Sequence, residues 1–291
     1  MNAFSATFKP ILLKLIPNSI LTVFYSRRVT KYNELSLGER DFFHAINDDV
    51  QTIFDVGART DVFYSSTPPT TTSGSDNTKA SLNRRVFMFE ANPKFSEVLR
   101  TKVDQIGGVN TIVSVAIGAE RGELNYFYDS QSFIEVSNVG NKSKYRSFRK
   151  MAVETIDNYA STIPDLDFIK IDIEEMDFMA LVGARETLGR VRFIQFELGI
   201  GAEYKSKKVT NSDYWDLLDP IFDLYILKDE ANPIWQAHPG LELLIPLDSE
   251  AKSLIEVLQR CGVGFNIVGL NRSFEVSQKL ASNIRGATLS L

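Results

Sequence analysis

Short runs of β-branched and aromatic residues alternate with longer stretches of helical pattern from residue 51 onward. Most of these runs are almost wholly apolar, as strands must be when helices cover both faces of their sheet. We expect strands at residues 52–55, 86–90, 111–116, 167–172, 193–198, 222–227 and 265–270. The alternation predicts an α/β fold built on a doubly wound, mostly parallel sheet with helices on both faces.

The stretches between the strands carry apolar residues three or four positions apart, the spacing that places them on one face of a helix. The two clearest faces consist of Phe95, Val98, Leu99, Val103 and Ile106 and of Leu254, Val257, Leu258 and Cys261. We therefore expect a helix over each stretch, with its apolar face against the sheet.

Two segments depart from this alternation. Residues 67–85, TPPTTTSGSDNTKASLNRR, contain one large apolar residue, Leu82, and are otherwise rich in Thr, Ser, Pro, Gly and Asn. That composition cannot bury a core face and predicts a mobile insertion loop at the surface. Residues 123–129, ELNYFYD, alternate in character after a turn, which predicts an extra antiparallel strand.

The N-terminal stretch 8–28, FKPILLKLIPNSILTVFYSRR, is apolar enough to raise the question of a membrane segment. Lys14 and Pro17 interrupt it, and its longest uncharged run is shorter than the roughly 20 residues that cross a bilayer. No small-residue cleavage site follows, so a signal peptide fits poorly. We expect a helical appendage that packs on the main domain; the alternative is peripheral membrane contact through residues 8–28.

The chain of 291 residues is 44% hydrophobic and 24% charged, which excludes general disorder and provides for a large core. We expect the N-terminal helical appendage to span residues 1–48. The α/β domain follows at 49–275, and a C-terminal tail at 276–291 ends the chain.

Charge and cysteine content narrow the classes of protein. The formal net charge of −5 gives no overall electrostatic case for nucleic acid, so any basic patch must be local. The single cysteine, Cys261, excludes an intramolecular disulfide and any multi-cysteine metal site. These features are typical of a cytoplasmic protein, and assembly into a homo-oligomer stays open.

Candidate chemistry begins at the ends of the first two expected strands. The stretch 53–66, IFDVGARTDVFYSS, starts as a buried strand and turns after Asp55 and Gly57, and the next strand ends in Glu90. An acid at this position of a doubly wound sheet lies over the crevice and can accept both hydroxyl hydrogens of a ribose. The alternative is an acid that merely starts the helix beside Asn92.

The stretch 168–188, FIKIDIEEMDFMALVGARETL, places Asp172 and Glu174 at the carboxyl end of a buried strand, where such sheets bind ligands. The neighbouring acids Glu175 and Asp177 fit a helix N-terminus, which favours negative charge. We expect a site role for Asp172 and Glu174.

The ordered segments DVGA, FEANP, VSVAIGAERGELNYF, AVETIDNYA, FIKIDIEEMDFMALVGA and FIQFELG resemble the FkbM-type family of S-adenosylmethionine-dependent methyltransferases. The resemblance covers residues 48–200, and several motifs in order are more specific than any one of them. It implies a seven-stranded Rossmann-like sheet, S-adenosyl-L-methionine as cofactor, and methyl transfer to an oxygen of a sugar or related natural-product scaffold.

The resemblance also implies roles for individual residues. Asp55 and Gly57 match the motif that faces the methionine part of the cofactor, and Glu90 matches the acid that binds the ribose hydroxyls. The whole expected cofactor-binding set is Asp55, Gly57, Ala58, Arg59, Glu90, Val115, Ala116 and Asp172, in which Val115 and Ala116 form the wall near the adenine.

Catalysis is expected from carboxylates. Asp172 and Glu174 match the acids of the family's Lys-x-Asp-x-Glu-Gly stretch, which borders donor and acceptor, and Glu197 after the fifth strand is a runner-up. A carboxylate that accepts the hydroxyl proton adds about 10²–10⁴ in rate. The composition requires no metal, although these three acids could hold a hard cation through oxygen ligands.

The sequence departs from the family pattern in the first loop, where Arg59 and Asp61 replace the usual Asn and Gly, and at Glu175, which replaces a Gly. Because this cofactor has no pyrophosphate, the strongest reason for a second loop glycine is missing. We expect the loop to hold the cofactor, with Arg59 pairing with a carboxylate. The alternative is a methyltransferase-fold protein that binds a glycan or a partner without catalysis.

The run NKSKYRSFRK, residues 141–150, is basic and contains no acid. Lys142, Lys144 and Arg146 are expected to attract an anionic acceptor, and Tyr126 to stack on a sugar face. The alternative is a solvated basic face without a ligand.

Overall fold

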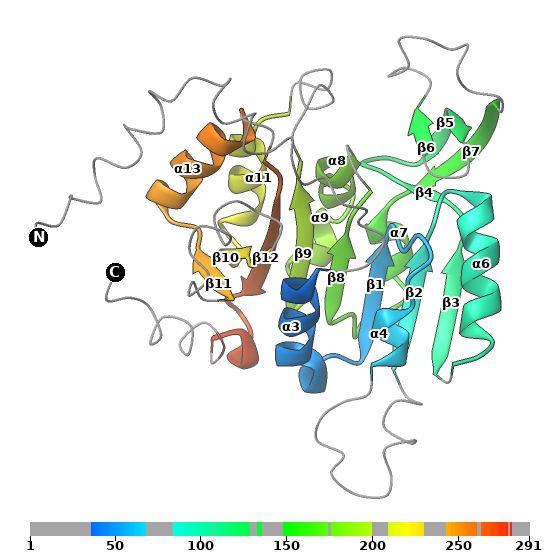
Figure 1. Ribbon diagram of the computed structural model, residues 1–291, viewed down its shortest axis with the longest axis horizontal. Coiled ribbons are helices and arrows are strands. Elements are labelled where there is room, and N and C mark those ends of the chain that lie inside the picture. Colours follow the sequence, from blue (N-terminus) through cyan, green and yellow to red (C-terminus); the bar gives the residue numbers. More distant parts are fainter. Residues whose placement is uncertain are drawn as a thin grey trace, which may run out of the picture.

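The computed structural model describes residues 36–67, 84–106, 108–128, 133–135, 148–173, 176–199, 209–229, 243–260, 263–278 and 280. Its centre is an eight-stranded sheet with the strand order β11-β10-β12-β9-β8-β1-β2-β3 (Figure 1). The strands are β1 (Thr52–Val56), β2 (Arg85–Phe89), β3 (Val109–Val113), β8 (Phe168–Ile171), β9 (Phe193–Leu198), β10 (Phe222–Leu227), β11 (Leu244–Pro246) and β12 (Phe265–Asn271).

The predicted α/β class is confirmed, and each of the seven expected strands has a counterpart within a few residues. β3, β2, β1, β8 and β9 run parallel, whereas β12 is antiparallel to both β9 and β10. The short edge strand β11 makes the main sheet one strand larger than the expected seven. Because parallel strands end at one edge, Asp55, Glu90 and Asp172 come from neighbouring carboxyl ends.

A second, four-stranded sheet stands beyond this carboxyl edge (Figure 1). Its strands, in the order β4-β7-β5-β6, are β4 (Ala116–Ile117), β5 (Gly122–Tyr128), β6 (Phe133–Glu135) and β7 (Phe148–Glu154). The extra antiparallel strand predicted from ELNYFYD is confirmed as β5, which pairs antiparallel with β6 and β7.

The third strand was expected at residues 111–116, and the predicted end of this strand is wrong. β3 stops at Val113, whose carbonyl oxygen accepts the N–H of Glu90 at 3.0 Å. Ala116 then pairs with Val153 in the smaller sheet, so it belongs to β4 and not to the end of the third strand. Ala116 and Ile117 are also buried there, and the unbroken apolar pattern therefore gave no sign of the change of sheet.

Side-chain caps explain where several helices begin. Ser36 and Glu39 form a capping box at α3, Asn92 accepts the Lys94 N–H at α6, and Asp248 accepts the Ala251 N–H at α13. The helices are α3 (Leu37–Ile46), α4 (Phe63–Ser66), α6 (Pro93–Val103), α7 (Ile156–Ala160), α8 (Asp177–Val182), α9 (Arg185–Leu188), α11 (Asn211–Leu218) and α13 (Ser249–Gln259), with a 3-10 turn η2 (Asn47–Asp49).

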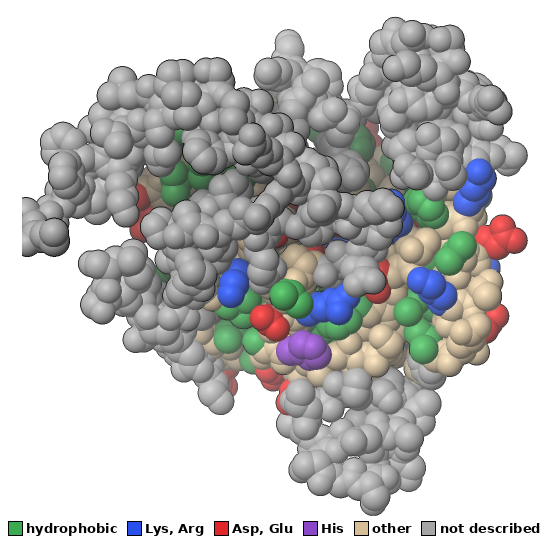
Figure 2. All heavy atoms as spheres, in the orientation of Figure 1, with side chains coloured by type: hydrophobic (Ala, Val, Ile, Leu, Met, Phe, Trp, Pro, Cys, Tyr) green, Lys and Arg blue, Asp and Glu red, His purple; other side chains and the backbone are tan. Residues whose placement is uncertain are grey.

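Helices cover both faces of the main sheet, and each face has its own apolar core. Phe42, Phe43 and Tyr64 of α3 and α4 pack with Phe168 and Phe193 on one face, which Figure 1 shows toward the viewer. α7, α8, α9, α11 and α13 supply the core of the other face. On the viewer's face, acidic and basic side chains are interspersed over the visible described surface (Figure 2).

Two local expectations need correction. Val98 was expected on the buried face of α6, but it is 41% exposed, and Leu99 beside it is fully buried. At the expected loop 67–85, Arg85 opens β2, and the buried Arg84 donates to the carbonyl oxygens of Asn47 (2.8 Å), Val50 (3.2 Å) and Thr67 (2.6 Å). Residues 68–83 lie outside the described residues.

The expected N-terminal appendage is described only from residue 36 onward, where α3 packs into the core of one sheet face. In the parts of the chain that the structure describes, no helix combines the length and apolarity needed to cross a membrane.

Candidate active site

The first loop turns directly after β1, and the chain needs glycine at residue 57. Gly57 has φ +89°, and a Cβ there would lie 1.9 Å from the carbonyl oxygen of Asp172. The N–H groups of Gly57 and Ala58 both donate to the carbonyl oxygen of Phe89, at 2.9 and 3.2 Å. These bonds tie the loop to the end of β2, and the close approach of Gly57 to Asp172 sets it against the end of β8.

Arg59 takes the left-handed conformation, with φ +54°. Its exposed guanidinium lies 5.6 Å from the ring centroid of Phe95, and it forms no ion pair with a described residue. Its backbone N–H donates to Glu90 Oε2 at 2.8 Å. The expected pairing of Arg59 with a carboxylate is therefore made by its backbone and not by its side chain.

Glu90 lies just past β2 and is only 7% exposed. Oε1 accepts the Asn92 N–H at 2.6 Å, so each carboxylate oxygen accepts one backbone N–H and keeps a further lone pair. Burial raises the pKa of Glu90 to about 7, although the two N–H donors oppose the shift. The alternative was that Glu90 is an acid that starts the next helix. The residue that caps α6 is Asn92, and not Glu90.

Lys170 holds the acids of β1 and β8 together. Its buried ammonium lies 3.2 Å from Asp172 Oδ2 and 3.6 Å from Asp55 Oδ1. Burial lowers the pKa of Lys170, but the charges of Asp172, Asp55 and Glu39 raise it by more, so the pKa lies well above its ordinary value. Burial raises the pKa of Asp55 to about 6, with Lys170 as the main opposing influence. We call Asp55, Lys170, Asp172 and Glu39 the Lys170 cluster.

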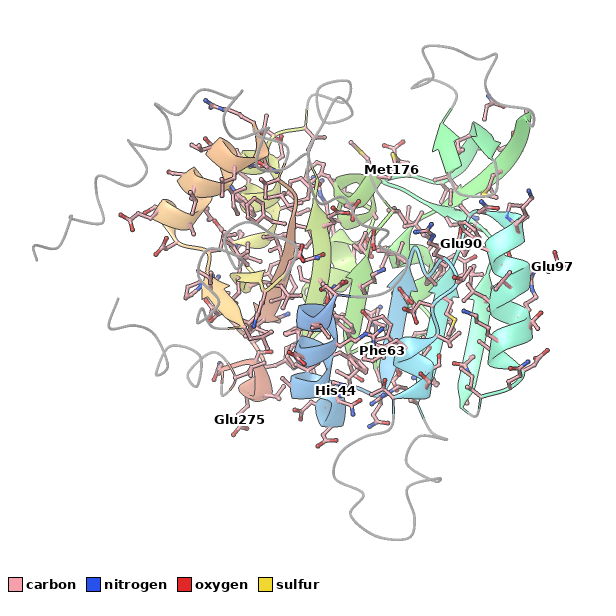
Figure 3. The ribbon with its side chains drawn as sticks, viewed as in Figure 1. His44, Phe63, Glu90, Glu97, Met176 and Glu275 are labelled. Carbon is pink, nitrogen blue, oxygen red and sulfur yellow. The ribbon has the colours of Figure 1, made fainter. Side chains whose placement is uncertain are left out.

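Glu197 lies on β9, half-buried, one position beyond the residue that pairs with Ile171. Continuing that register places it opposite Asp172, and the Asp172 side chain is 43% exposed. The carboxyl edge therefore has a lower layer of Asp55 and Lys170 and an upper layer of Gly57, Asp172 and Glu197. Figure 3 shows Glu90 at this end of the sheet, together with Met176, which lies just before α8.

The remaining expected residues divide into two groups. Val115 is half-buried against the core, and Ala116 is the buried β4 residue already described. Glu174, Lys142, Lys144 and Arg146 lie outside the described residues, as does the side chain of Tyr126, whose backbone pairs with Arg149. No group of three or more His, Cys, Asp or Glu side chains within the described ranges could hold a metal ion.

Sequence reasoning missed Lys170 and Glu39. A lysine inside the apolar strand FIKIDI was the available signal for the first, since a buried lysine must be paired. Glu39 had no such signal, because a capping box on a surface helix explains it fully.

The strand order and the cofactor-type turn at β1 define an α/β protein of the class I methyltransferase type. The model of the family described as "Methyltransferase FkbM domain" matches residues 43–224. This is more than half of the chain, which therefore belongs to that family, as its motifs predicted. Membership of this family implies a methyltransferase that uses S-adenosylmethionine.

Solved structures with a similar overall course are distant. A precorrin-6y C5,15-methyltransferase from Geobacter metallireducens GS-15 is 10% identical, with a TM-score of 0.38 over 85% of this chain and 94% of that one. A putative O-methyltransferase from Klebsiella pneumoniae is 12% identical, with a TM-score of 0.40 over 92% and 97%. No curated protein matches the sequence. Likeness at this level contributes nothing to the choice of acceptor.

Proposed function

We propose that the protein is an S-adenosylmethionine-dependent O-methyltransferase that acts on a hydroxyl of a sugar, a glycan or a related natural-product acceptor. Family membership supports the methyl transfer and the cofactor. The observation that carries the cofactor site is the Glu90 carboxylate, which is buried beside the Gly57 turn and keeps one lone pair on each oxygen.

The residues at the carboxyl edge fit the cofactor. A carboxylate with two available acceptor positions suits the vicinal hydroxyls of a ribose, and charge-assisted hydrogen bonds contribute on the order of 1.5–3 kcal/mol each. Gly57 contributes no side chain to the upper layer, and the Arg59 guanidinium lies over Phe95, outside the loop. The bound cofactor would supply an electrophilic methyl group, and the chain's task is to hold an acceptor oxygen in line with it.

Asp172 is our candidate for the carboxylate that takes the acceptor's proton. Lys170 occupies Oδ2 at 3.2 Å, so Oδ1 is the atom that would accept it. The side chain is 43% exposed, which gives an acceptor access to it. Glu197, opposite Asp172 in the extended register, is the second candidate, and Glu174 follows from the family motif alone.

The proposed chemical class of the acceptor is inferred from residues in and next to the smaller sheet. Its strands β6 and β7 bracket residues 136–147, which carry Lys142, Lys144 and Arg146, and β5 carries Tyr126. Since this sheet stands beyond the carboxyl edge, we propose that these residues bind an anionic sugar or glycan (Figure 1). Such binding should weaken as ionic strength rises.

The first experiment is calorimetric titration with S-adenosylmethionine of the wild type, Glu90→Ala and Glu97→Gln, whose acid lies exposed on α6 (Figure 3). We expect Glu90→Ala to weaken binding tenfold or more and Glu97→Gln to leave it unchanged. Wild-type protein that binds no cofactor would refute the proposal and favour the non-catalytic alternative.

Transfer itself is tested by mass spectrometry of neutral and acidic sugar acceptors incubated with the protein and cofactor. Asp172→Asn should bind cofactor but lose about 10²–10⁴ in rate. An unchanged rate would remove Asp172 as the base and leave Glu197→Gln as the next variant.

A further inference from the structure

A row of polar side chains crosses three neighbouring strands beneath the proposed cofactor site. Asp55 pairs in register with Lys170, and Lys170 pairs with Gln195 of β9. Residues opposite each other in register point to the same face of a sheet. That face is the one α3 covers, because Ile53, Phe168 and Phe193, one layer lower on the same strands, share a core cluster with α3.

Glu39 reaches this row from α3. Gln195 Nε2 donates to Glu39 Oε1 at 2.7 Å, while Oε2 accepts the Ser36 N–H at 2.8 Å. The carboxylate is 7% exposed. A capping acid normally faces solvent at a helix start, so a buried one that also contacts the sheet is doing more than capping.

The charge of Glu39 bears on the cluster above it. Its pKa is raised by burial, and Lys170 is the largest opposing influence. Lys170 of β8 and Asp172 beyond it act on Glu39 directly, and Tyr64 of α4 is near enough for Glu39 to raise its pKa. Asp55 of β1 lies in the same row on the far side of Lys170, with Asp61 of the first loop among the groups that act on it. Two carboxylates contact the one ammonium and Glu39 acts on it through its charge, so the ionised Lys170 cluster carries net negative charge.

We propose that Glu39 is a positioning residue for the cofactor site: held by Gln195, the register partner of Lys170, it attracts the Lys170 ammonium from below through its charge and supplies negative charge that favours a sulfonium ligand. The inference rests on the proposed function. Glu39 precedes the segment that the family model matches, residues 43–224, so this residue contributes to the site from outside that segment.

The chemistry of the ligands provides a clean readout. S-adenosylmethionine has a positively charged sulfonium, whereas its product, S-adenosylhomocysteine, has a neutral thioether. A negative charge in the site therefore favours the first over the second. A residue that only supports the fold would affect both ligands alike.

Glu39→Gln removes the charge and keeps the same number of hydrogen bonds when the Gln195 amide turns over, which reverses the direction of the bond between the two side chains. Its amide oxygen can accept the Ser36 N–H, and its amide N–H can donate to Gln195 Oε1, which is buried without a hydrogen bond among the described residues. Gln also satisfies a capping box. We therefore expect the urea midpoint of the variant at pH 6 to match that of the wild type.

The experiment is calorimetric titration of both ligands at pH 8, using wild type, Glu39→Gln and the exposed control Glu97→Gln. At pH 8 we expect Glu39→Gln to weaken S-adenosylmethionine about two- to fivefold and to leave S-adenosylhomocysteine unchanged. Glu97→Gln should alter neither affinity.

Equal weakening of both ligands, or no weakening of either, would overturn the inference. If the wild type binds neither ligand, the proposed function fails, and the inference is then tested in ligand-free protein by NMR titration of the Asp55 carboxyl. Glu39→Gln should lower that titration midpoint, because Lys170 then serves fewer anions; an unchanged midpoint would overturn the inference on its own.

Discussion

Asp55 and Glu90 are buried acids at the ends of adjacent strands, and they are held in different ways. Glu90 accepts two backbone N–H groups and has a pKa of about 7. Asp55 is more deeply buried, yet its pKa is about 6, because a full positive charge on Lys170 lies 3.6 Å away. Uncharged donors leave Glu90 ready to bind a ligand's hydroxyls, whereas an ammonium commits Asp55 to the architecture of the sheet.

The sharpest contrast should come from Lys170→Met. Removing the ammonium leaves Asp55 and Glu39 buried without their cation, which should lower the free energy of unfolding by about 3–5 kcal/mol. Urea denaturation measures this loss. Lys150→Met is the matched control, since Lys150 is exposed and pairs with exposed Glu123 at 3.2 Å, and it should cost about 0–1 kcal/mol.

The double variant Lys170→Met with Asp55→Asn should recover part of the lost stability, because it removes the charge of one of the two carboxylates that are left buried without a cation. If Lys170→Met proves as stable as the Lys150 control, the assignment of Lys170 as the structural counter-ion is wrong.

Glu90→Gln should weaken binding without lowering stability. The folded-state pKa of Glu90 is raised from 4.5 to about 7, so its contribution to stability is present below pH 4.5 and is lost as pH rises through 7. At pH 8 the Gln variant avoids the cost of burying this charge, about 1–3 kcal/mol, but it leaves the Arg59 or the Asn92 N–H without an acceptor, so we expect it to be no less stable than the wild type. Its cofactor affinity should fall at least tenfold, since an amide accepts only through one oxygen.

Urea denaturation and calorimetry at pH 8 measure the two effects. A variant that loses stability and affinity together would show that Glu90 serves the fold of the loop and not the ligand.

Wild-type cofactor affinity should depend on pH. The ionised form of Glu90 is the better acceptor for two hydroxyl hydrogens, so affinity should rise by about tenfold between pH 6 and pH 8 as the group titrates. The same titration of Glu90→Gln corrects for ionisation of the ligand and of other groups. An identical pH dependence in both proteins would exclude Glu90 as its source.

The smallest effect should come from Arg59→Gly. Glycine adopts the left-handed conformation at no steric cost, so stability should rise by up to about 1 kcal/mol. The backbone N–H that reaches Glu90 is kept, and cofactor affinity should stay within about twofold of the wild type. Arg59→Ala removes the side chain but keeps the strain, and a tenfold loss of affinity in both variants would show that the guanidinium contacts the ligand.

Hydrophobic periodicity predicted the seven main strands and β5, because burial on both faces leaves a mark in the sequence. The positions of Asp55, Gly57 and Glu90 followed from the rule that ligands bind at strand ends. The contacts within the Lys170 cluster could not be predicted from the sequence, since only strand register shows that Lys170 lies between Asp55 and Gln195. Ala116 was misplaced because a strand in either sheet has the same apolar pattern.

The three bonds of Arg84 have a practical consequence for protein engineering. Arg84 and Thr67 stand at the two ends of the segment 68–83, and the Arg84 guanidinium donates to the Thr67 carbonyl oxygen. The same guanidinium donates to the carbonyl oxygens of Asn47 in η2 and of Val50 before β1. This clamp lies at the amino end of β2, whereas Glu90 lies past its carboxyl end. Residues 68–83 are therefore a suitable place to graft a short linker, a fluorescent reporter or an affinity tag, with the two anchoring ends held together independently of what joins them.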